Sequence, residues 1–456
     1  MAVKSLKKTI RPAPLTLLDK VFVGILLTVF GGIVLHAPIS VGFSTLFPTA
    51  ELLIKSWKEI LLLAAGLLML AILHRKKRFG LLRNPLVLVI AGYAMLHLLL
   101  VPVFWKGGES TIAGLFIDLR YLLFFVLVYV AICLYPQLRR AFIITFFAGA
   151  FVVATFALLQ VFVLPNDILK YIGYNTSTIV PFLTVDENPD YIRINSTLRG
   201  PNPLGAYAVI VLALLFAFWL RAKQAVPQGR KLVFSVIAIG SFIALWASYS
   251  RSALVAAFVA LAVIVLATVG RQLPRKIWIG LFVVMFAIAG GLFAARDTDF
   301  VSNVILHENA TTGAETSSND GHVESLREGL SRMARQPFGG GVGSTGSASL
   351  YSADEPIIIE NQFLFIAHEA GWLGLILFVS IMYLVLRELW RKRADWIALG
   401  LFASGIGLTL IGLLLPVWVD DTVAIIWWGL AAVVLGGKEL NGRALDEKAK
   451  RTTRLR

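Results

Sequence analysis

A carboxylate at the mouth of an apolar segment, Glu360, is of a type that can transfer protons. Glu360-Asn361-Gln362 ends a long polar stretch and stands directly before a run of hydrophobic residues. A carboxylate in this position can act as a general base that takes the proton of a substrate hydroxyl. The residues also suit a structural role, because helix dipoles favour acids near N-termini and Asn361 is a good helix cap. The sequence leaves both interpretations of Glu360 open.

Three arginines at the ends of apolar segments could meet a negatively charged substrate. Arg120 opens one segment, Arg199 precedes another in Arg199-Gly-Pro-Asn-Pro, and Arg251 lies in a short Ser-Arg-Ser turn. A guanidinium group donates two parallel hydrogen bonds to phosphate oxygens, so the three together predict a diphosphate site. Each could instead anchor its helix at the membrane interface. Asp118 could also pair with Arg120, which would make Arg120 structural.

A glycine-rich turn precedes the Glu360 segment. Residues 341–346 match the Gly-x-Gly-x-x-Gly pattern, but no strand-helix-strand unit surrounds them, which excludes a dinucleotide site. Glycines let the backbone approach a ligand closely, and successive amides can cradle an anion. A flexible lid, an anion-binding turn and a plain linker all fit Gly341 and Gly343.

His368 and Glu369 lie two turns inside the apolar segment that follows Glu360. Ionisable residues inside membrane segments are candidates for function, although this pair could simply form hydrogen bonds in a helix interface. The six histidines do not have the spacing of metal ligands, and the single Cys133 cannot form an intrachain disulfide. We therefore expect neither a metal nor a cofactor and interpret Cys133 as a packing residue.

The composition indicates which elements must hold these residues. Of the 456 residues, 58% are hydrophobic and 15% are charged, and the mean hydropathy is +0.79. Soluble domains contain about a quarter charged residues, so an all-α, polytopic membrane protein is predicted. Apolar runs of about 20 residues span a bilayer as helices. They predict twelve membrane segments, at 21–35, 52–73, 86–104, 119–134, 142–164, 204–220, 232–249, 253–269, 277–294, 363–386, 396–415 and 417–434.

The distribution of basic residues predicts the orientation of these helices. With both termini in the cytoplasm, most of the 42 Lys and Arg lie in inner segments, as the positive-inside rule requires. Contacts with anionic membrane lipids then account for the net charge of +15 without nucleic acid as a partner. A single membrane domain, 1–456, carries two long outer loops, 165–203 and 296–360. In the second loop, residues 322–333 have the apolar spacing of a short amphipathic helix on the membrane surface.

These motifs and their order resemble the O-antigen ligase and O-antigen polymerase family of bacterial envelope glycan enzymes. Glu360-Asn361 is followed by nine residues and then by Gly371-Trp-Leu-Gly374, a frame that the family's ligases begin with histidine. The Arg199 and Arg251 segments look like the family's two arginine motifs. Residues 327–330 (Arg-Glu-Gly-Leu) and 337–343 (Pro-Phe-Gly-Gly-Gly-Val-Gly) are also similar to it. Because Glu360 replaces the ligase histidine, the resemblance favours the polymerase branch.

The resemblance implies a metal-independent glycosyltransferase of the cytoplasmic (inner) membrane with its active site on the outer face. Its donor would be a polyprenyl-diphosphate-linked oligosaccharide and its acceptor a glycan or a lipid-linked glycan. We expect inverting transfer, with Glu360 as the base and Arg199, Arg251 and Arg120 holding the diphosphate. Supporting residues are expected at Asn361, His368, Gly341, Gly343 and Arg327.

Two other functions fit the sequence. One is a transporter or flippase of lipid-linked glycans, and the other is the transfer of an oligosaccharide to a protein hydroxyl. Transporters usually place charged groups near the bilayer midplane and often contain repeats. The charged candidates here cluster at one face, which favours an enzyme.

Overall fold

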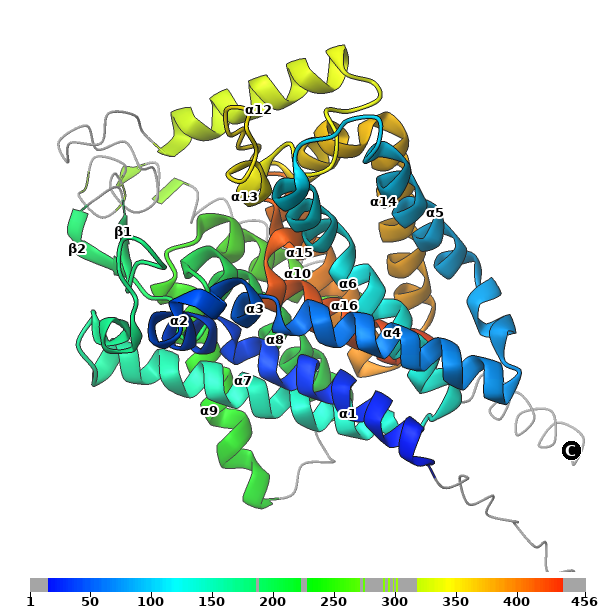
Figure 1. Ribbon diagram of the computed structural model, residues 1–456. Coiled ribbons are helices and arrows are strands. Elements are labelled where there is room, and N and C mark those ends of the chain that lie inside the picture. Colours follow the sequence, from blue (N-terminus) through cyan, green and yellow to red (C-terminus); the bar gives the residue numbers. More distant parts are fainter. Residues whose placement is uncertain are drawn as a thin grey trace, which may run out of the picture.

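The computed structural model of the chain describes residues 15–185, 188–222, 228–270 and 318–437, with isolated positions between 274 and 301. Its architecture is all-α apart from one small hairpin (Figure 1). Within the described residues, seven helices are long and apolar enough to cross a membrane, and four shorter helices are also apolar. The chain is therefore a polytopic membrane protein. The seven are α1 (Leu17–Gly32) with its continuation α2 (His36–Leu46), α4 (Trp57–Lys76), α6 (Gly108–Leu134), α7 (Leu138–Phe162), α8 (Pro201–Ala222), α10 (Arg251–Val269) and α14 (Gln362–Arg391). The shorter four are α5 (Pro85–Leu100), α9 (Gln228–Ala247), α15 (Trp396–Gly412) and α16 (Asp421–Gly436).

The predicted membrane segments overlap these helices, except that the ninth, at 277–294, lies almost entirely outside the described residues. The first span continues through α2 to Leu46 instead of ending near residue 35. Helix α6 begins at Gly108 instead of near residue 119. Its first turns contain Glu109 and Asp118, whose polarity hides them from a hydropathy window. They are helical because Ser110 and Gly114 are buried against the glycine-rich turn. The number of membrane crossings and their orientation remain predictions.

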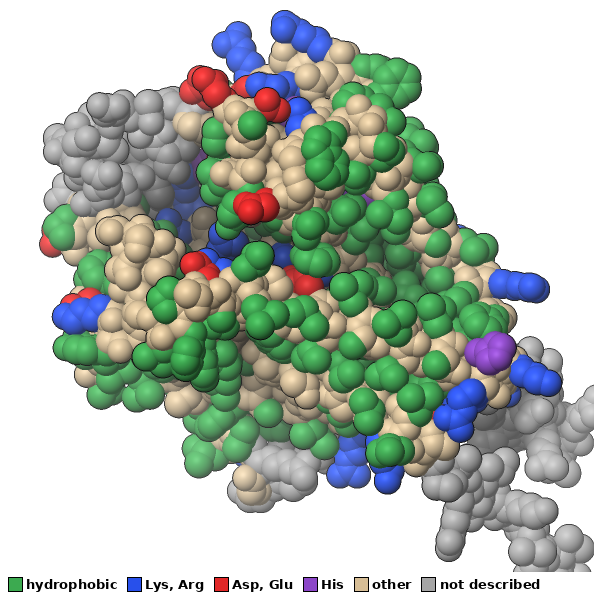
Figure 2. All heavy atoms as spheres, viewed as in Figure 1, with side chains coloured by type: hydrophobic (Ala, Val, Ile, Leu, Met, Phe, Trp, Pro, Cys, Tyr) green, Lys and Arg blue, Asp and Glu red, His purple; other side chains and the backbone are tan. Residues whose placement is uncertain are grey.

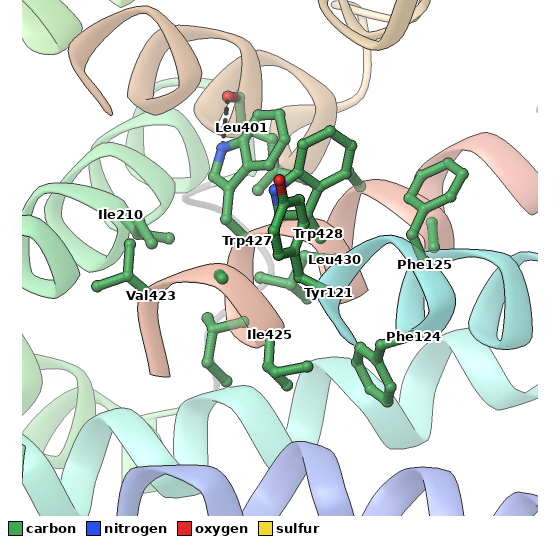
Figure 3. Close-up of a cluster of buried hydrophobic side chains, with 14 of the residues drawn as sticks. Tyr121, Phe124, Phe125, Ile210, Leu401, Val423, Ile425, Trp427, Trp428 and Leu430 are labelled. Carbon is green, nitrogen blue, oxygen red and sulfur yellow. Dashed lines mark hydrogen bonds between the residues drawn. The ribbon is translucent and has the colours of Figure 1, made fainter. Parts of the chain in front are cut away.

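Helix α16 is the centre of the bundle. Its Trp427 and Trp428 are fully buried and pack edge to face, with ring centroids 5.2 Å apart. Tyr121 and Phe125 of α6 lie against Trp428 at 5.4 and 5.8 Å (Figure 3). The indole N–H of Trp427 donates to the carbonyl of Leu401 in α15 at 3.2 Å. A helix that is apolar on every side belongs in a core, and α16 lies there.

The other helices pack in pairs around this core. Helix α15 lies on α8 and α10, α7 lies on α9, and α14 lies on α5. Strands β1 (Leu183–Val185) and β2 (Asn188–Arg193) form an antiparallel hairpin in the first long loop. In the second loop, α12 (Ser318–Arg335) covers the residues predicted to form an amphipathic helix. Figure 1 shows α12 lying across one end of the bundle, above α13 (Gly346–Ser349) and the start of α14. The short α3 (Glu51–Lys55) precedes α4.

Helix α14 is broken at Gly371, and the glycine-rich turn repairs the break. Gly371 has φ +67°, which interrupts the helix. The carbonyls of His368 and Glu369 therefore lose their donors from the next turn of the helix. The amide of Gly340 donates to the first carbonyl, and that of Gly341 donates to the second at 3.1 Å. The turn thus supplies the hydrogen bonds that the helix cannot make.

A further hydrogen bond, between Trp372 and Pro337, joins the helix to the turn in the opposite direction. The N–H of Trp372, freed by the break, donates to the carbonyl of Pro337 at 2.9 Å. Gly343 is held just as closely on α6, because a Cβ there would clash with the carbonyl of Ser110. Its φ of +82° also suits only glycine. The turn is therefore a wedge between α6 and α14.

Single cysteines can test the predicted orientation. The only native cysteine is Cys133, so Cys133→Ser provides a thiol-free background. In that background, Ala353→Cys on the second long loop should react with a membrane-impermeant maleimide added to spheroplasts. Arg78→Cys, after α4, should react only once the membrane is permeabilised. Both positions are exposed, so the reverse labelling pattern would contradict the orientation.

Gly343→Ala should destabilise the wedge. The added methyl group meets backbone, and a left-handed residue other than glycine is strained, so we expect a loss of about 2 kcal/mol or more. Thermal unfolding of the purified protein in detergent measures this effect. Gly66→Ala is the matched control: no atom lies within 4 Å of the new Cβ, and alanine favours the helix. Equal melting temperatures for the two variants would refute the packing argument.

Candidate active site

Glu360 lies just before α14, and its side chain turns toward α12. Its Oε2 forms an ion pair with Nδ1 of His322, and its N–H donates to Oγ of Ser325 at 2.9 Å. The side chain is 35% exposed, so a solute can reach the carboxylate. A protonated His322 would favour the charged carboxylate and fix its orientation. The contact partner of Glu360 is thus a histidine on α12 rather than an arginine.

The cap of α14 is Asn361, not Glu360. Oδ1 of Asn361 accepts the N–H groups of Phe363 at 2.9 Å and Leu364 at 3.1 Å. Its Nδ2 donates to the carbonyl of Leu413, just after α15, at 2.8 Å. These bonds give Asn361 the capping role that was one interpretation of this segment. The Glu360 carboxylate has no part in the cap.

Gln362 connects the start of α14 to Arg120. Its Oε1 accepts the N–H of Trp418 at 2.8 Å, within the short 3₁₀ helix η7 (Val417–Val419). The carbonyl of Val419 in turn accepts a hydrogen bond from Nη2 of Arg120. The Glu360 segment and Arg120 are therefore attached to the same short connection between α15 and α16.

Arg120 belongs to a buried cluster of charges. Its Nη2 pairs with Oδ1 of Asp421, and its Nη1 lies 3.6 Å from Oε1 of Glu59. Nζ of Lys58 lies 3.1 Å from both acids, and Nε2 of His36 lies 3.2 Å from Asp421. Arg120, Lys58 and Glu59 are all buried. Buried charges are tolerated when each has an opposite partner, and this cluster meets that condition.

Asp118, the alternative partner expected for Arg120, faces a different group. Its Oδ2 lies 3.3 Å from Nε2 of His97, and its carboxyl interacts with that of Glu369. Oε1 of Glu369 accepts the N–H of Thr345 at 3.2 Å. Glu369 thus lies in a helix interface, which was one interpretation of it, and its partners are Asp118 and the loop rather than its neighbour His368. Together they form a second buried chain of ionisable groups between α5, α6 and α14.

The two predicted arginine segments lie against each other. A Cβ on Gly205, in α8, would stand 2.9 Å from Oγ of Ser248 and 3.1 Å from Cβ of Ser250, in the turn before α10. Arg193 of β2 bridges the two segments. Its Nε donates to the carbonyl of Ser248 at 2.9 Å, and its Nη2 donates to Oδ1 of Asn202 at 2.7 Å. The structure therefore brings the Arg199 and Arg251 motifs together.

Arg199 is exposed and forms no hydrogen bond or ion pair with the part of the chain that the structure describes. Both Arg199 and Arg120 interact electrostatically with Asp420, the cap of α16. Arg251 is partly buried at the first residue of α10. In Figure 2, basic and acidic side chains gather in a hollow on the face shown. The arginine segments and the start of α16 thus form one polar region.

Two residues of this region have left-handed backbone, Ser196 at φ +49° and Tyr249 at φ +46°. Ser196 is fixed by its N–H, which donates to Oε1 of Gln160 at 2.7 Å, and by its hydroxyl, which donates to the carbonyl of Val153 at 2.8 Å. Burial raises the pKa of the Tyr249 phenol, and Tyr191 adds to the shift. The phenol therefore stays protonated at neutral pH. Such backbone persists only where the surroundings fix it, often at functional sites.

The remaining predicted residues have other surroundings. Gly341 and Gly343 are buried in the wedge, and the amide of Gly341 is committed to a carbonyl of α14. In this conformation the turn is neither a free lid nor an open anion cradle. Arg327 is exposed on α12, and we find no hydrogen bond or ion pair for it within the described ranges. His368 is buried and lines a small pocket between α12 and the glycine-rich turn.

Sequence reasoning missed Lys58, Glu59, Asp421 and the bridging Arg193. The sequence did contain a signal for Asp421, because Asp420-Asp421 interrupts an apolar region. Charged residues inside membrane segments are candidates for function. No local pattern pairs residues so far apart in the chain. Their partnership depends on how α4, α6 and α16 pack.

Comparison with known proteins agrees with the motifs. Residues 236–379 match a family model described as O-antigen ligase, a range that contains Arg251, Glu360 and the glycines at 371 and 374. An O-antigen polymerase of Salmonella muenchen is 25% identical over 239 residues, which are 51% of this chain and 56% of that protein. The chain thus spans about half the length of this curated relative. It carries an O-antigen ligase family domain at residues 236–379, which confirms the resemblance predicted from its motifs.

Proposed function

We propose that the chain is a membrane glycosyltransferase that moves an oligosaccharide from a polyprenyl diphosphate to a sugar hydroxyl on the outer face of the cytoplasmic membrane. The acceptor oxygen forms a bond to the anomeric carbon while the bond between that carbon and the diphosphate oxygen breaks. The acceptor proton passes to Glu360. The polyprenyl diphosphate leaves with the electron pair, and the anomeric configuration inverts.

One observation carries this proposal: segments distant in the sequence bring cationic side chains together and connect them to the segment that carries Glu360. The Arg199 and Arg251 segments touch, and Arg199 forms no hydrogen bond or ion pair in the described ranges. The start of α14 is attached to the connection that holds Arg120. Cations aimed at the leaving diphosphate stabilise the charge that develops on it. The match to the O-antigen ligase model supports the same reaction class.

The arginines have different parts in this proposal. Arg199 is exposed and available to bind phosphate oxygens directly, and Arg251 is the first residue of α10, in the segment that packs against the Arg199 segment. Arg120 is already paired with Asp421 and Glu59, so a direct contact with phosphate would leave a buried acid with fewer partners. We assign Arg120 mainly to positioning Asp420 and Asp421 and to the positive potential of the region.

The acceptor side is assigned to Glu360 and α12. His322 holds the carboxylate in place, and the ring can carry a proton away from it after transfer. Glutamate at a position where the ligases have histidine supports a glycan acceptor of the polymerase kind.

A transporter of lipid-linked glycans is the second candidate, and one observation favours it. The buried chain His97, Asp118 and Glu369 is the kind of intramembrane ionisable group that transporters use. Product analysis in proteoliposomes separates the two functions. A new glycosidic bond identifies an enzyme, whereas movement of an unchanged lipid identifies a transporter.

Glu360→Gln should abolish most of the activity. The amide keeps the size of the side chain but cannot accept a proton, so turnover should fall by a factor on the order of 100 or more. Release of polyprenyl diphosphate from lipid-linked oligosaccharide in proteoliposomes measures turnover. Glu324→Gln changes an exposed acid of α12 and should leave turnover unchanged. Near-normal turnover by correctly inserted Glu360→Gln would assign the base to another group.

Arg199→Ala should lower turnover by about 100-fold, because the leaving diphosphate loses a cationic donor. Arg199→Lys should recover only part of the loss, since an ammonium group lacks the planar fork that fits two phosphate oxygens. Arg335→Ala removes an exposed arginine of α12 to which no role is assigned, and it serves as the control. If Arg199→Ala and Arg335→Ala had equal turnover, Arg199 would have no role in binding the diphosphate.

A further inference from the structure

A small pocket opens between the end of α12, the glycine-rich turn and the first turns of α14. Its volume is about 90 Å³, which is room for several water molecules or for part of one sugar ring. His368 lines it and is only 2% exposed. The ring is close to the turn, because a Cβ on Gly340 would stand 3.1 Å from its Nε2. Lys106, before α6, and Arg332, on α12, stand at the rim.

The pocket contains polar groups without partners. Neither ring nitrogen of His368 has a hydrogen bond of good geometry within the described residues, although the backbone of Ser344 lies beside the ring. The amide oxygen of Gln336 also lacks a partner among these residues. Buried polar groups in proteins nearly always have a partner, so such a set indicates something that binds there.

The chemistry of these groups selects a ligand that both donates and accepts hydrogen bonds. A neutral imidazole has one donor and one acceptor nitrogen, and the Gln336 amide likewise offers both kinds of group. A phosphate or carboxylate could only accept. The charges around the pocket also favour a neutral ligand, because both cations that line it already have acidic partners. Lys106 is paired with Asp354 at 3.0 Å and Arg332 with Glu328 at 2.6 Å. A hydroxyl group has the required properties, and sugars present several.

The pocket is near Glu360 and on the side away from the arginines. Ile357 lines it, and Glu360 follows three residues later. On α12, Ser325 contacts Glu360 and Arg332 lines the pocket. These two residues are seven positions apart, which is about 10 Å along the helix. Arg120 lies much further along α6, about 18 Å from the first residue of that helix. A short oligosaccharide can extend from the pocket to Glu360.

We propose that this pocket binds one neutral, hydroxyl-bearing sugar residue of the acceptor glycan. His368 holds a sugar hydroxyl, and the bound residue sets the position of the acceptor chain so that the attacking hydroxyl lies at Glu360. The inference rests on the proposed glycan transfer and adds the acceptor subsite to it. His368 is thus a positioning residue, separate from the chemistry at Glu360.

Saturation-transfer NMR on the full-length protein in lipid nanodiscs tests the pocket. The probe is the oligosaccharide released by mild acid from the lipid-linked repeat unit of the producing cells. His368→Phe removes both ring nitrogens and fills the space, and should weaken binding by about tenfold or more. His368→Gln keeps a donor and an acceptor and should bind within about threefold of the wild type.

Gln336→Leu is a second pocket variant, and it lies at the end of α12, where it does not disturb the core. Arg335→Ala is the matched control outside the pocket.

Three outcomes would overturn the proposal. The first is unchanged binding in both His368→Phe and Gln336→Leu. The second is displacement of the oligosaccharide by inorganic pyrophosphate, which would make the pocket an anion site. The third is no oligosaccharide signal in the wild type, which would leave the pocket to water. Turnover in the same nanodiscs is scored separately: His368→Phe should raise KM for the acceptor with little change in kcat. Absence of transfer by the wild type would reject the proposed function, while the NMR result still decides whether the pocket binds sugar.

Discussion

The exchange of hydrogen bonds at the break in α14 is the interaction on which this end of the helical bundle depends. A helix interrupted inside an apolar bundle exposes carbonyls that water cannot reach, and unpaired backbone groups are costly there. The glycine-rich turn supplies the missing donors, and Pro337 accepts the amide that the break releases. Nine residues of helix, about 13 Å, separate this joint from Glu360. The hydrogen bonds at Gly371 and the cap at Asn361 therefore fix the two ends of the helical segment that carries His368 and follows Glu360.

The buried charge cluster at the start of α16 is the second constraint. Lys58, Glu59, Arg120 and Asp421 come from three helices, and each charge is tolerated only because the others are present. The cluster therefore holds α4, α6 and α16 in register, and Asp420 beside it interacts electrostatically with both Arg120 and Arg199. An arginine engaged in this way is poorly suited to release its partners during each reaction. Under the proposed function, Arg199, exposed on the adjacent loop, would bind and release the diphosphate at a lower cost in free energy.

The sequence was most informative where a local pattern determines structure. Apolar runs predicted the described membrane helices, because burial in lipid or core requires such runs, and the segment predicted at 277–294 lies almost entirely outside the described residues. Polar residues at the start of α6 concealed its first three turns. The glycines at 341 and 343 suggested an anion-binding turn, since glycine permits that as well as close packing. Only the carbonyls of α14 and the approach of Ser110 distinguish the two. Pairs such as Arg120 with Asp421, and Glu360 with His322, depend on the tertiary arrangement and leave no local signature.

The arrangement also suits a displacement reaction at an anomeric carbon. Inversion requires that the attacking oxygen and the leaving diphosphate stand on opposite sides of that carbon. In this fold Glu360 lies beside α12 at the start of α14, whereas Arg199 lies just before α8, which packs on α10. The connection at η7 joins the two parts, because it donates a hydrogen bond to Gln362 of α14 and follows α15, which packs on both α8 and α10. Two groups that act on opposite faces of one atom must keep a constant separation. A short segment attached to both parts maintains that separation more reliably than a direct contact between the groups, which would occupy the place of the substrate.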